Sequence, residues 1–185
     1  MATKQSNSVP ETRLVRQAQK GDAGAFGQIY DTYIDRVFRF VHFRVNETQL
    51  AEDLTADTFL KAWDNLGKYE ERGLPFAAWL FRIARNTVID HYRTQKEELP
   101  LEAAATQTSE TDPNEQVHRG LTGEEIRRAM SKLTQAQQDV LILKFIAGFS
   151  TKIVAGILNK KPGAIRALQM RGLQALDEIM ESEDG

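Results

Sequence analysis

The chain of 185 residues contains no cysteine, which excludes disulfides, thiolate metal sites and cysteine nucleophiles. Long apolar runs are also absent. A membrane-spanning helix needs about 20 largely apolar residues, so we expect neither a signal peptide nor a membrane span. Strong net charge is lacking as well: 24 Lys+Arg oppose 26 Asp+Glu, giving −2. This balance argues against a general polyanion binder. Cytoplasmic localisation is the simplest expectation, because the chain needs no oxidising compartment.

Histidine is scarce too. The three histidines, His42, His91 and His118, are scattered over separate segments. No spacing of metal ligands and no nucleophile–base pair accompanies them. We therefore expect no metal site, no cofactor and no enzymatic activity. Hydrophobic residues make up 41% of the chain, which is enough to build buried cores.

The near-zero net charge hides a segregated pattern. Residues 1–94 carry 13 cations and 12 acids, whereas residues 95–118 carry one cation and six acids. Residues 140–176 carry six cations and no acid at all. Segregation of this kind is what a local binding site for a polyanion requires.

Apolar residues recur at spacings of three and four over most of the chain, which is typical of amphipathic helices. No stretch has a convincing strand pattern. A Thr/Ser/Gln-rich, acidic stretch with two prolines interrupts the helical pattern and is typical of a linker. We therefore predict an all-α protein with two small helical domains joined by an acidic flexible linker. The expected segments are a tail (1–10), a helical domain (11–94), the linker (95–118), a helix-turn-helix domain (119–180) and an acidic tail (181–185).

The second domain contains a helix-turn-helix signature. Ser150 suits a helix N-cap, Asn159 suits a left-handed C-cap, and Pro162 suits the first turn of the next helix. On a helical wheel Ile165 and its apolar neighbours cluster on one side, leaving cations and small residues outside. Lys160, Lys161, Arg166 and Arg171 therefore indicate DNA contact. The alternative is an ordinary solvated face, although such faces usually mix charge signs.

The first domain contains a loop with aromatic side chains, followed by a helix edge with Arg and Asn. This combination resembles a site for single-stranded nucleic acid. The alternative is that the aromatics belong to the core, as we expect for Trp79 and Phe81. The edge residues are Arg82, Asn86, Ile89 and Arg93, with Asp90 beside them, and the loop contains Tyr69, Glu70, Glu71, Arg72, Gly73 and Phe76.

Three carboxylates lie within six residues in AEDLTADTF, namely Glu52, Asp53 and Asp57, close to Leu54 and Leu60. No catalytic partner accompanies them. They form either a solvated face or a protein-binding surface, and the protein-binding surface is the better functional interpretation.

Four motifs occur in an order that resembles the bacterial sigma factors of the extracytoplasmic-function (ECF) type. They are AFGQIYDTYIDRVFRFV, AEDLTADTFLKAW, PFAAWLFRIARNTVIDHYR and STKIVAGILNKKPGAIRALQMRGLQAL. The resemblance covers about residues 11–178. It implies a subunit that binds core RNA polymerase, recognises the melted −10 promoter element and reads the −35 element as duplex. A stand-alone helix-turn-helix regulator is the alternative, but it has no reason to carry AEDLTADTFLKAW.

The resemblance also assigns partners and residues. The partners are the coiled coil of the largest polymerase subunit, the polymerase flap, promoter DNA and an anti-sigma factor. Polymerase contact is implied for Glu52, Asp53, Asp57 and Leu60. Contact with the single-stranded −10 element is implied for Tyr69, Arg72, Phe76, Arg82, Arg85, Asn86, Asp90 and Arg93. Contact with the −35 duplex is implied for Lys160, Lys161, Arg166, Gln169 and Arg171.

Overall fold

The structure is a computed structural model that describes residues 10–98 and 123–183. Within these ranges every regular element is helical and no strand occurs, which confirms the predicted all-α class. The first range holds α1 (Glu11–Gln19), α2 (Ala23–Val45), α3 (Thr48–Asn65), the short 3-10 turn η1 (Leu66–Lys68) and α4 (Phe76–Glu98). The second holds α5 (Gly123–Ser131), α6 (Gln135–Leu141), the π-helical stretch η2 (Ile142–Ile146), α7 (Thr151–Leu158) and α8 (Pro162–Glu183).

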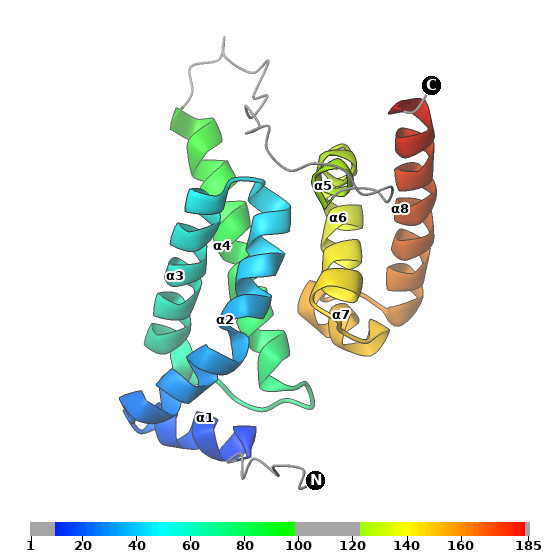
Figure 1. Ribbon diagram of the computed structural model, residues 1–185. Helices are drawn as coiled ribbons and strands as arrows, with labels where there is room; N and C mark the ends of the chain where they lie inside the picture. Colours follow the sequence, from blue (N-terminus) through cyan, green and yellow to red (C-terminus); the bar gives the residue numbers. More distant parts are fainter. Residues whose placement is uncertain (1–9, 99–122, 184–185) are drawn as a thin grey trace, which may run out of the picture.

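Helices α2, α3 and α4 pack side by side, and α1 lies across one end of them (Figure 1). Asp22 starts α2 by accepting a hydrogen bond from the Ala25 N–H at 3.0 Å. Asn46 ends α2 in the left-handed conformation, with φ of 55°. Fully buried side chains such as Phe40 and Phe81 fill the space between the helices. This first unit is therefore a helical bundle with its own core.

The second unit is built around α6 and α8, which pack along each other. Thr134 and Gln137 form a reciprocal capping box at the start of α6. The predicted caps of the helix-turn-helix are confirmed: Ser150 accepts from the Ile153 N–H, and Asn159 has φ 52° and ψ 47°. Together α7 and α8 form the predicted helix-turn-helix.

The helix ends differ from the predicted boundaries. Helix α4 continues to Glu98, four residues past the expected end of the first domain at position 94. The extension has a physical reason, because the first helix-breaking residue after it is Pro100. Helix α8 likewise runs past position 180 to Glu183. Most of the predicted linker, residues 1–9 of the first tail and residues 184–185 of the second lie outside the described residues.

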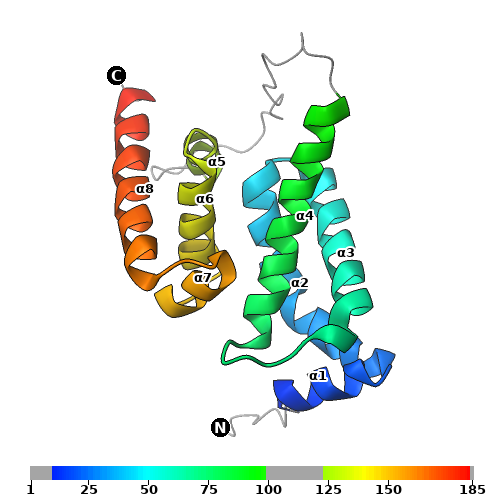
Figure 2. The ribbon, with the colours of Figure 1, turned by 180° about the vertical axis from the view of Figure 1, so that it is seen from behind.

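The two units pack directly against each other. Helix α4 contacts α7, and α2 contacts η2, so the second unit lies beside α2 and α4 while α8 lies on its far side (Figures 1 and 2). The ring of Phe81 meets the ring of Phe149 edge to face, with 4.7 Å between centroids. The buried apolar residues of both units therefore form one continuous cluster.

Candidate DNA and polymerase interfaces

The cationic surface of the helix-turn-helix is exposed. Ile165 is fully buried, which turns the adjacent Arg166 to solvent. Lys160, Lys161 and Arg171 are exposed as well, whereas Gln169 is half-buried. Within the described part of the chain, no acidic side chain forms an ion pair with these cations. The surface is thus free to contact an anionic partner.

Helix α3 carries the predicted acidic surface. Glu52, Asp53 and Asp57 are exposed, and Leu60 beside them is 63% exposed. Leu54 and Phe59 of the same helix are buried, which fixes the outward direction of the acidic face.

Two aromatic side chains extend this surface and were not predicted as site residues. Trp63 of α3 and Tyr30 of α2 are 37% and 39% exposed. Each is braced by a second ring, with centroids 4.9 Å apart for Trp63 and Phe26 and 4.7 Å apart for Tyr30 and Phe59. Helical spacing alone does not distinguish them from core residues, because both lie at the edge of the apolar stripe of their helices. An exposed apolar patch with an acidic rim is typical of a protein-binding surface.

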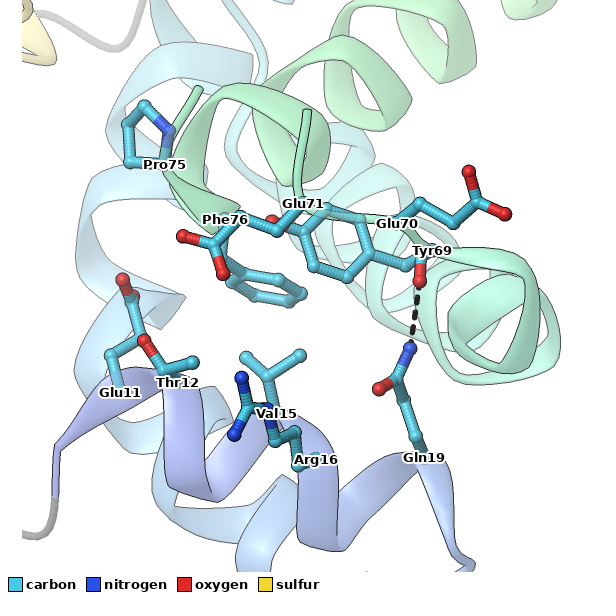
Figure 3. A pocket seen from close by; sticks show the side chains of 10 residues that line it. All are labelled: Glu11, Thr12, Val15, Arg16, Gln19, Tyr69, Glu70, Glu71, Pro75 and Phe76. Carbon is cyan, nitrogen blue, oxygen red and sulfur yellow. Dashed lines mark hydrogen bonds between the residues drawn. The ribbon is translucent and has the colours of Figure 1, made fainter. Parts of the chain in front are cut away.

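The loop between η1 and α4 is held in place by the first helix. The side-chain amide of Gln19 donates to the backbone oxygen of Leu66 at 3.1 Å and to that of Tyr69 at 2.8 Å, the second bond being drawn in Figure 3. The Tyr69 ring packs on Trp79, with centroids 5.1 Å apart. These contacts position the loop relative to α4.

The position of Phe76 differs from the predicted one. It was predicted to contact DNA bases, but it is only 3% exposed and forms the first turn of α4. Its ring packs against Tyr69 and Tyr33, so it belongs to the core beneath the loop. Tyr33 is anchored in turn, because its hydroxyl donates to the Glu11 carboxylate, and burial raises the pKa of that hydroxyl. A base cannot stack on Phe76 while this packing holds.

Two clefts flank the loop. One, of about 390 Å³, lies between the loop and α1, and Glu11, Glu70 and Glu71 line it together with Arg16 (Figure 3). The other, of about 410 Å³, lies between the loop and α4. Its lining includes three cations and the rings of Tyr69 and Trp79, with a single acid. The second cleft therefore has the charge and the aromatic surface that suit a nucleotide. Its cations are Lys68, Arg72 and Arg82.

The predicted nucleic-acid edge of α4 is partly covered by the second unit. An Arg82 Nη donates to the Gly156 backbone oxygen at 2.6 Å, and Arg85 Nε donates to Asp139 Oδ2 at 2.7 Å. Asn86 remains exposed. Arg93 and Asp90 pair with each other on the surface at 3.3 Å, rather than standing as separate contacts.

An apolar groove on the second unit was not predicted. It has a volume of about 280 Å³, and its lining contains no polar surface. Phe145 and Leu173 on its rim are 57% and 42% exposed. Phe43 of α2 supplies part of the wall across the interface between the units. The sequence does not indicate this groove, because Phe145 lies in a mostly apolar run that is typical of a buried helix.

A metal site and a membrane-spanning helix are two further features that the described residues could form. Among residues 10–98 and 123–183, no three His, Asp or Glu side chains gather as a metal site. No helix in these ranges is long and apolar enough to cross a membrane.

These features define a two-part helical DNA-binding protein with a helix-turn-helix. Residues 29–98 match the family model of Sigma-70 region 2, and residues 123–176 match that of Sigma-70, region 4. The chain belongs to the ECF sigma factors, which bind core RNA polymerase and promoter DNA and direct promoter-specific transcription initiation. This confirms the predicted family and function, and the region 2 match weighs against a stand-alone regulator.

Individual relatives agree with this assignment. The ECF RNA polymerase sigma factor BldN of Streptomyces coelicolor is 35% identical over 181 residues, covering 96% of this chain and 69% of that protein. The ECF RNA polymerase sigma factor SigW of Bacillus subtilis is 29% identical, and the match covers 89% of this chain and 93% of SigW. The sigma factor RpoE of Bartonella quintana, solved with the anti-sigma factor NepR, has a TM-score of 0.72 at 26% identity, covering 84% and 96%. CnrH, solved with the cytosolic domain of CnrY, shares the fold, with a TM-score of 0.72 at 24% identity and coverage of 93% and 97%.

Proposed function

We propose that the α3 surface binds the coiled coil of the largest polymerase subunit, through Glu52, Asp53, Asp57 and Leu60. The observation that carries this assignment is the 63% exposure of Leu60 beside three exposed carboxylates on one helix. An apolar side chain gains from leaving water at an interface, while rim charges give specificity and speed of association. Trp63 and Tyr30 extend the same patch and belong to the proposed contact.

The −35 duplex is contacted by the first half of α8 and the turn before it. Arg166 and Arg171 reach base edges, since an arginine can bond guanine O6 and N7 at once. Lys160 and Lys161 neutralise phosphates at the turn. Gln169 contributes less, because it is half-buried.

The melted −10 element is held by the loop and by α4. An unstacked base enters the cleft between them, beside Tyr69, while Arg72 and Arg82 hold the flanking phosphates. Arg85 and Asn86 contact the same strand from α4. Phe76 supports the loop from below instead of stacking on a base. Asp90 and Arg93 act as a pair at the end of this surface.

The apolar groove at Phe145 and Leu173 receives the polymerase flap. A groove with an entirely apolar lining suits the apolar face of an amphipathic segment. The α3 surface belongs to the first unit and most of the groove to the second, so that the polymerase contacts both units at once.

The protein itself is not an enzyme in this account and acts in the cytoplasm, where polymerase transcribes. The solved relatives RpoE and CnrH were each captured with a protein partner, an anti-sigma factor in the case of RpoE. By analogy, an anti-sigma factor holds this chain inactive by covering its polymerase-binding and DNA-binding surfaces.

Run-off transcription on a library of promoter-like duplexes tests the proposal. With core RNA polymerase, selective transcripts are expected only when the protein is added, and the enriched sequences give the promoter consensus. A protein that neither produces transcripts nor co-elutes with core polymerase would refute the assigned contacts.

A further inference from the structure

A third cleft lies at the junction of the two units and has no part in the contacts assigned above. Its volume is about 570 Å³, larger than either cleft beside the loop and larger than the apolar groove. Junctions between packed units are common places for small-ligand sites, and this volume falls in their usual range. The residues that matter here are Arg44, Ile89, Tyr92 and Arg93 from the first unit and Ser131 and Gln135 from the second.

The floor of this junction cleft is held by buried polar contacts. The guanidinium of Arg44, only 5% exposed, lies 3.0 Å from the Asp139 carboxylate. It also donates to the side-chain oxygen of Gln138 at 3.2 Å. The amide nitrogen of Gln138 donates in turn to the Leu133 backbone oxygen at 2.9 Å. Because these bonds fix the floor beforehand, a ligand would lose little free energy in ordering it.

One wall of the junction cleft offers an aromatic surface. The Tyr92 side chain lines the cleft and is 40% exposed. Its hydroxyl donates to the Arg44 backbone oxygen at 3.2 Å, which anchors the ring at its polar end. Ile89, one turn earlier on α4, is half-buried and extends the apolar part of the wall. A fixed, partly exposed ring of this kind is a stacking platform for a planar base.

The charge of the lining favours an anion. None of the described residues that line the cleft is acidic, whereas two are arginines. Arg93 lies on the rim with its side chain 69% exposed, and its ion pair with Asp90, at 3.3 Å, is also on the surface. Exposed pairs of this kind contribute little free energy, so a phosphate can replace the aspartate. Arginine suits that exchange because its guanidinium can bond two phosphate oxygens at once.

The second unit adds a polar group that can recognise a base edge. Gln135 uses its backbone oxygen toward Arg44, at 3.5 Å, and within the described part of the chain its exposed side-chain amide is unpaired. An amide presents one donor and one acceptor side by side, which matches N7 and N6 of adenine. The hydroxyl oxygen of Ser131, on the same side of the cleft, remains able to accept from a sugar hydroxyl.

We propose that the junction cleft is a binding site for an adenine nucleotide. The base stacks on Tyr92, Gln135 bonds its edge, and Arg93 holds the phosphates. This ligand is separate from promoter DNA and polymerase, and its site combines groups from both units. It would connect the free protein to the nucleotide pool of the cell.

Calorimetric titration of the full-length protein at about 0.15 M salt tests the proposal. The probes are ATP, adenosine and inorganic triphosphate, and salt weakens unspecific binding of anions to the exposed cations of α8. We expect ATP to bind at least about tenfold more tightly than adenosine or triphosphate, because each of these lacks half of the contacts. Absence of ATP binding would overturn the proposal. Triphosphate or adenosine that binds as tightly as ATP would overturn it too.

Two matched glutamine variants place the binding site. Gln135→Glu loses the amide donor and sets a carboxylate near the phosphates, so we expect at least about tenfold weaker ATP binding. Gln137→Glu makes the same change on the same helix but outside the cleft lining, and glutamate also completes the capping box with Thr134. Gln137→Glu should bind ATP like the parent. Equal ATP affinities of the two variants would overturn the proposal.

Substitutions of Tyr92 test stacking separately from the hydroxyl bond. Tyr92→Phe keeps the ring and should retain the parent's ATP affinity, whereas Tyr92→Ala should lose about tenfold. Circular dichroism checks that both variants are folded, and the glutamine variants decide the question if Tyr92→Ala is not. Folded alanine and phenylalanine variants with the same ATP affinity would contradict the assigned stacking and overturn the proposal.

Discussion

The side-chain amide of Gln19 reaches from α1 to the backbone oxygen of Tyr69, 50 residues away, at 2.8 Å. It donates at the same time to the Leu66 oxygen. A single side chain thereby ties the first helix to the start of the loop that we assign to the −10 element. Helix α1 therefore positions this loop, and it contributes both Glu11 and Arg16 to the cleft beside it.

Gln19→Ala should loosen that loop. Each lost hydrogen bond is worth about 1 kcal/mol, so the loop opens more often while the bundle stays folded. We expect faster hydrogen exchange at residues 69–76 and a several-fold loss of run-off transcription, with binding to core polymerase unchanged. Gln17→Ala, on the same helix, is the matched control. Unchanged exchange in the loop would contradict the positioning role of Gln19.

Leu60→Asp should abolish co-elution with core polymerase. Because Leu60 is 63% exposed, the free energy of unfolding should change by no more than about 0.5 kcal/mol. Met170→Asp, at a 58% exposed position on α8, is the control and should still co-elute with core. If both variants bind core equally well, the α3 surface is not the polymerase contact.

The substitutions Arg166→Ala and Lys160→Ala should change DNA binding in different ways. The arginine change removes base contacts and should reduce discrimination among −35 sequences by about 1–3 kcal/mol. The lysine change removes a phosphate contact and should weaken binding to all duplexes alike. Competition binding with the selected and a scrambled −35 duplex measures both effects. Equal losses of discrimination would mean that the groove assignment is wrong.

Acid should destabilise the protein through His42. Burial lowers the pKa of this imidazole, and the charge of Arg127 on α5 lowers it further. The folded state therefore favours the neutral ring, while the unfolded ring titrates near 6.5. The stabilisation that depends on the neutral His42 ring is complete above about pH 6.5. It is lost as the pH falls toward the lowered pKa that His42 has in the folded state.

Denaturant titrations at about pH 7.5 and 5.5 check this expectation. His42→Gln cannot be protonated and should show a smaller drop in unfolding free energy than the parent. His91→Gln makes the same change on α4 and is the matched control. An identical drop in the His42 variant would exclude this residue as a source of the acid sensitivity.

Local features of the fold were predictable because they depend on nearby residues. Helical periodicity, the caps at Ser150 and Asn159 and the outward face of Arg166 all follow from spacing along the chain. Phe76 was expected to face DNA because the residue pattern does not show that α4 begins at this residue and that its ring packs on Tyr69 and Tyr33. The interface between the two units was not predicted, since Asp139 is one acid on a helix and its two arginines lie 95 and 54 positions away.

Site-directed photocrosslinking of the holoenzyme on a selected promoter tests the central claim most directly. A photoreactive residue is placed at Tyr69 in one sample and at Arg166 in another. We predict that position 69 crosslinks only to single-stranded DNA of the −10 element, and that position 166 crosslinks to duplex about 25 base pairs upstream. Crosslinks from both positions to the same element, or from position 69 to intact duplex, would contradict the account.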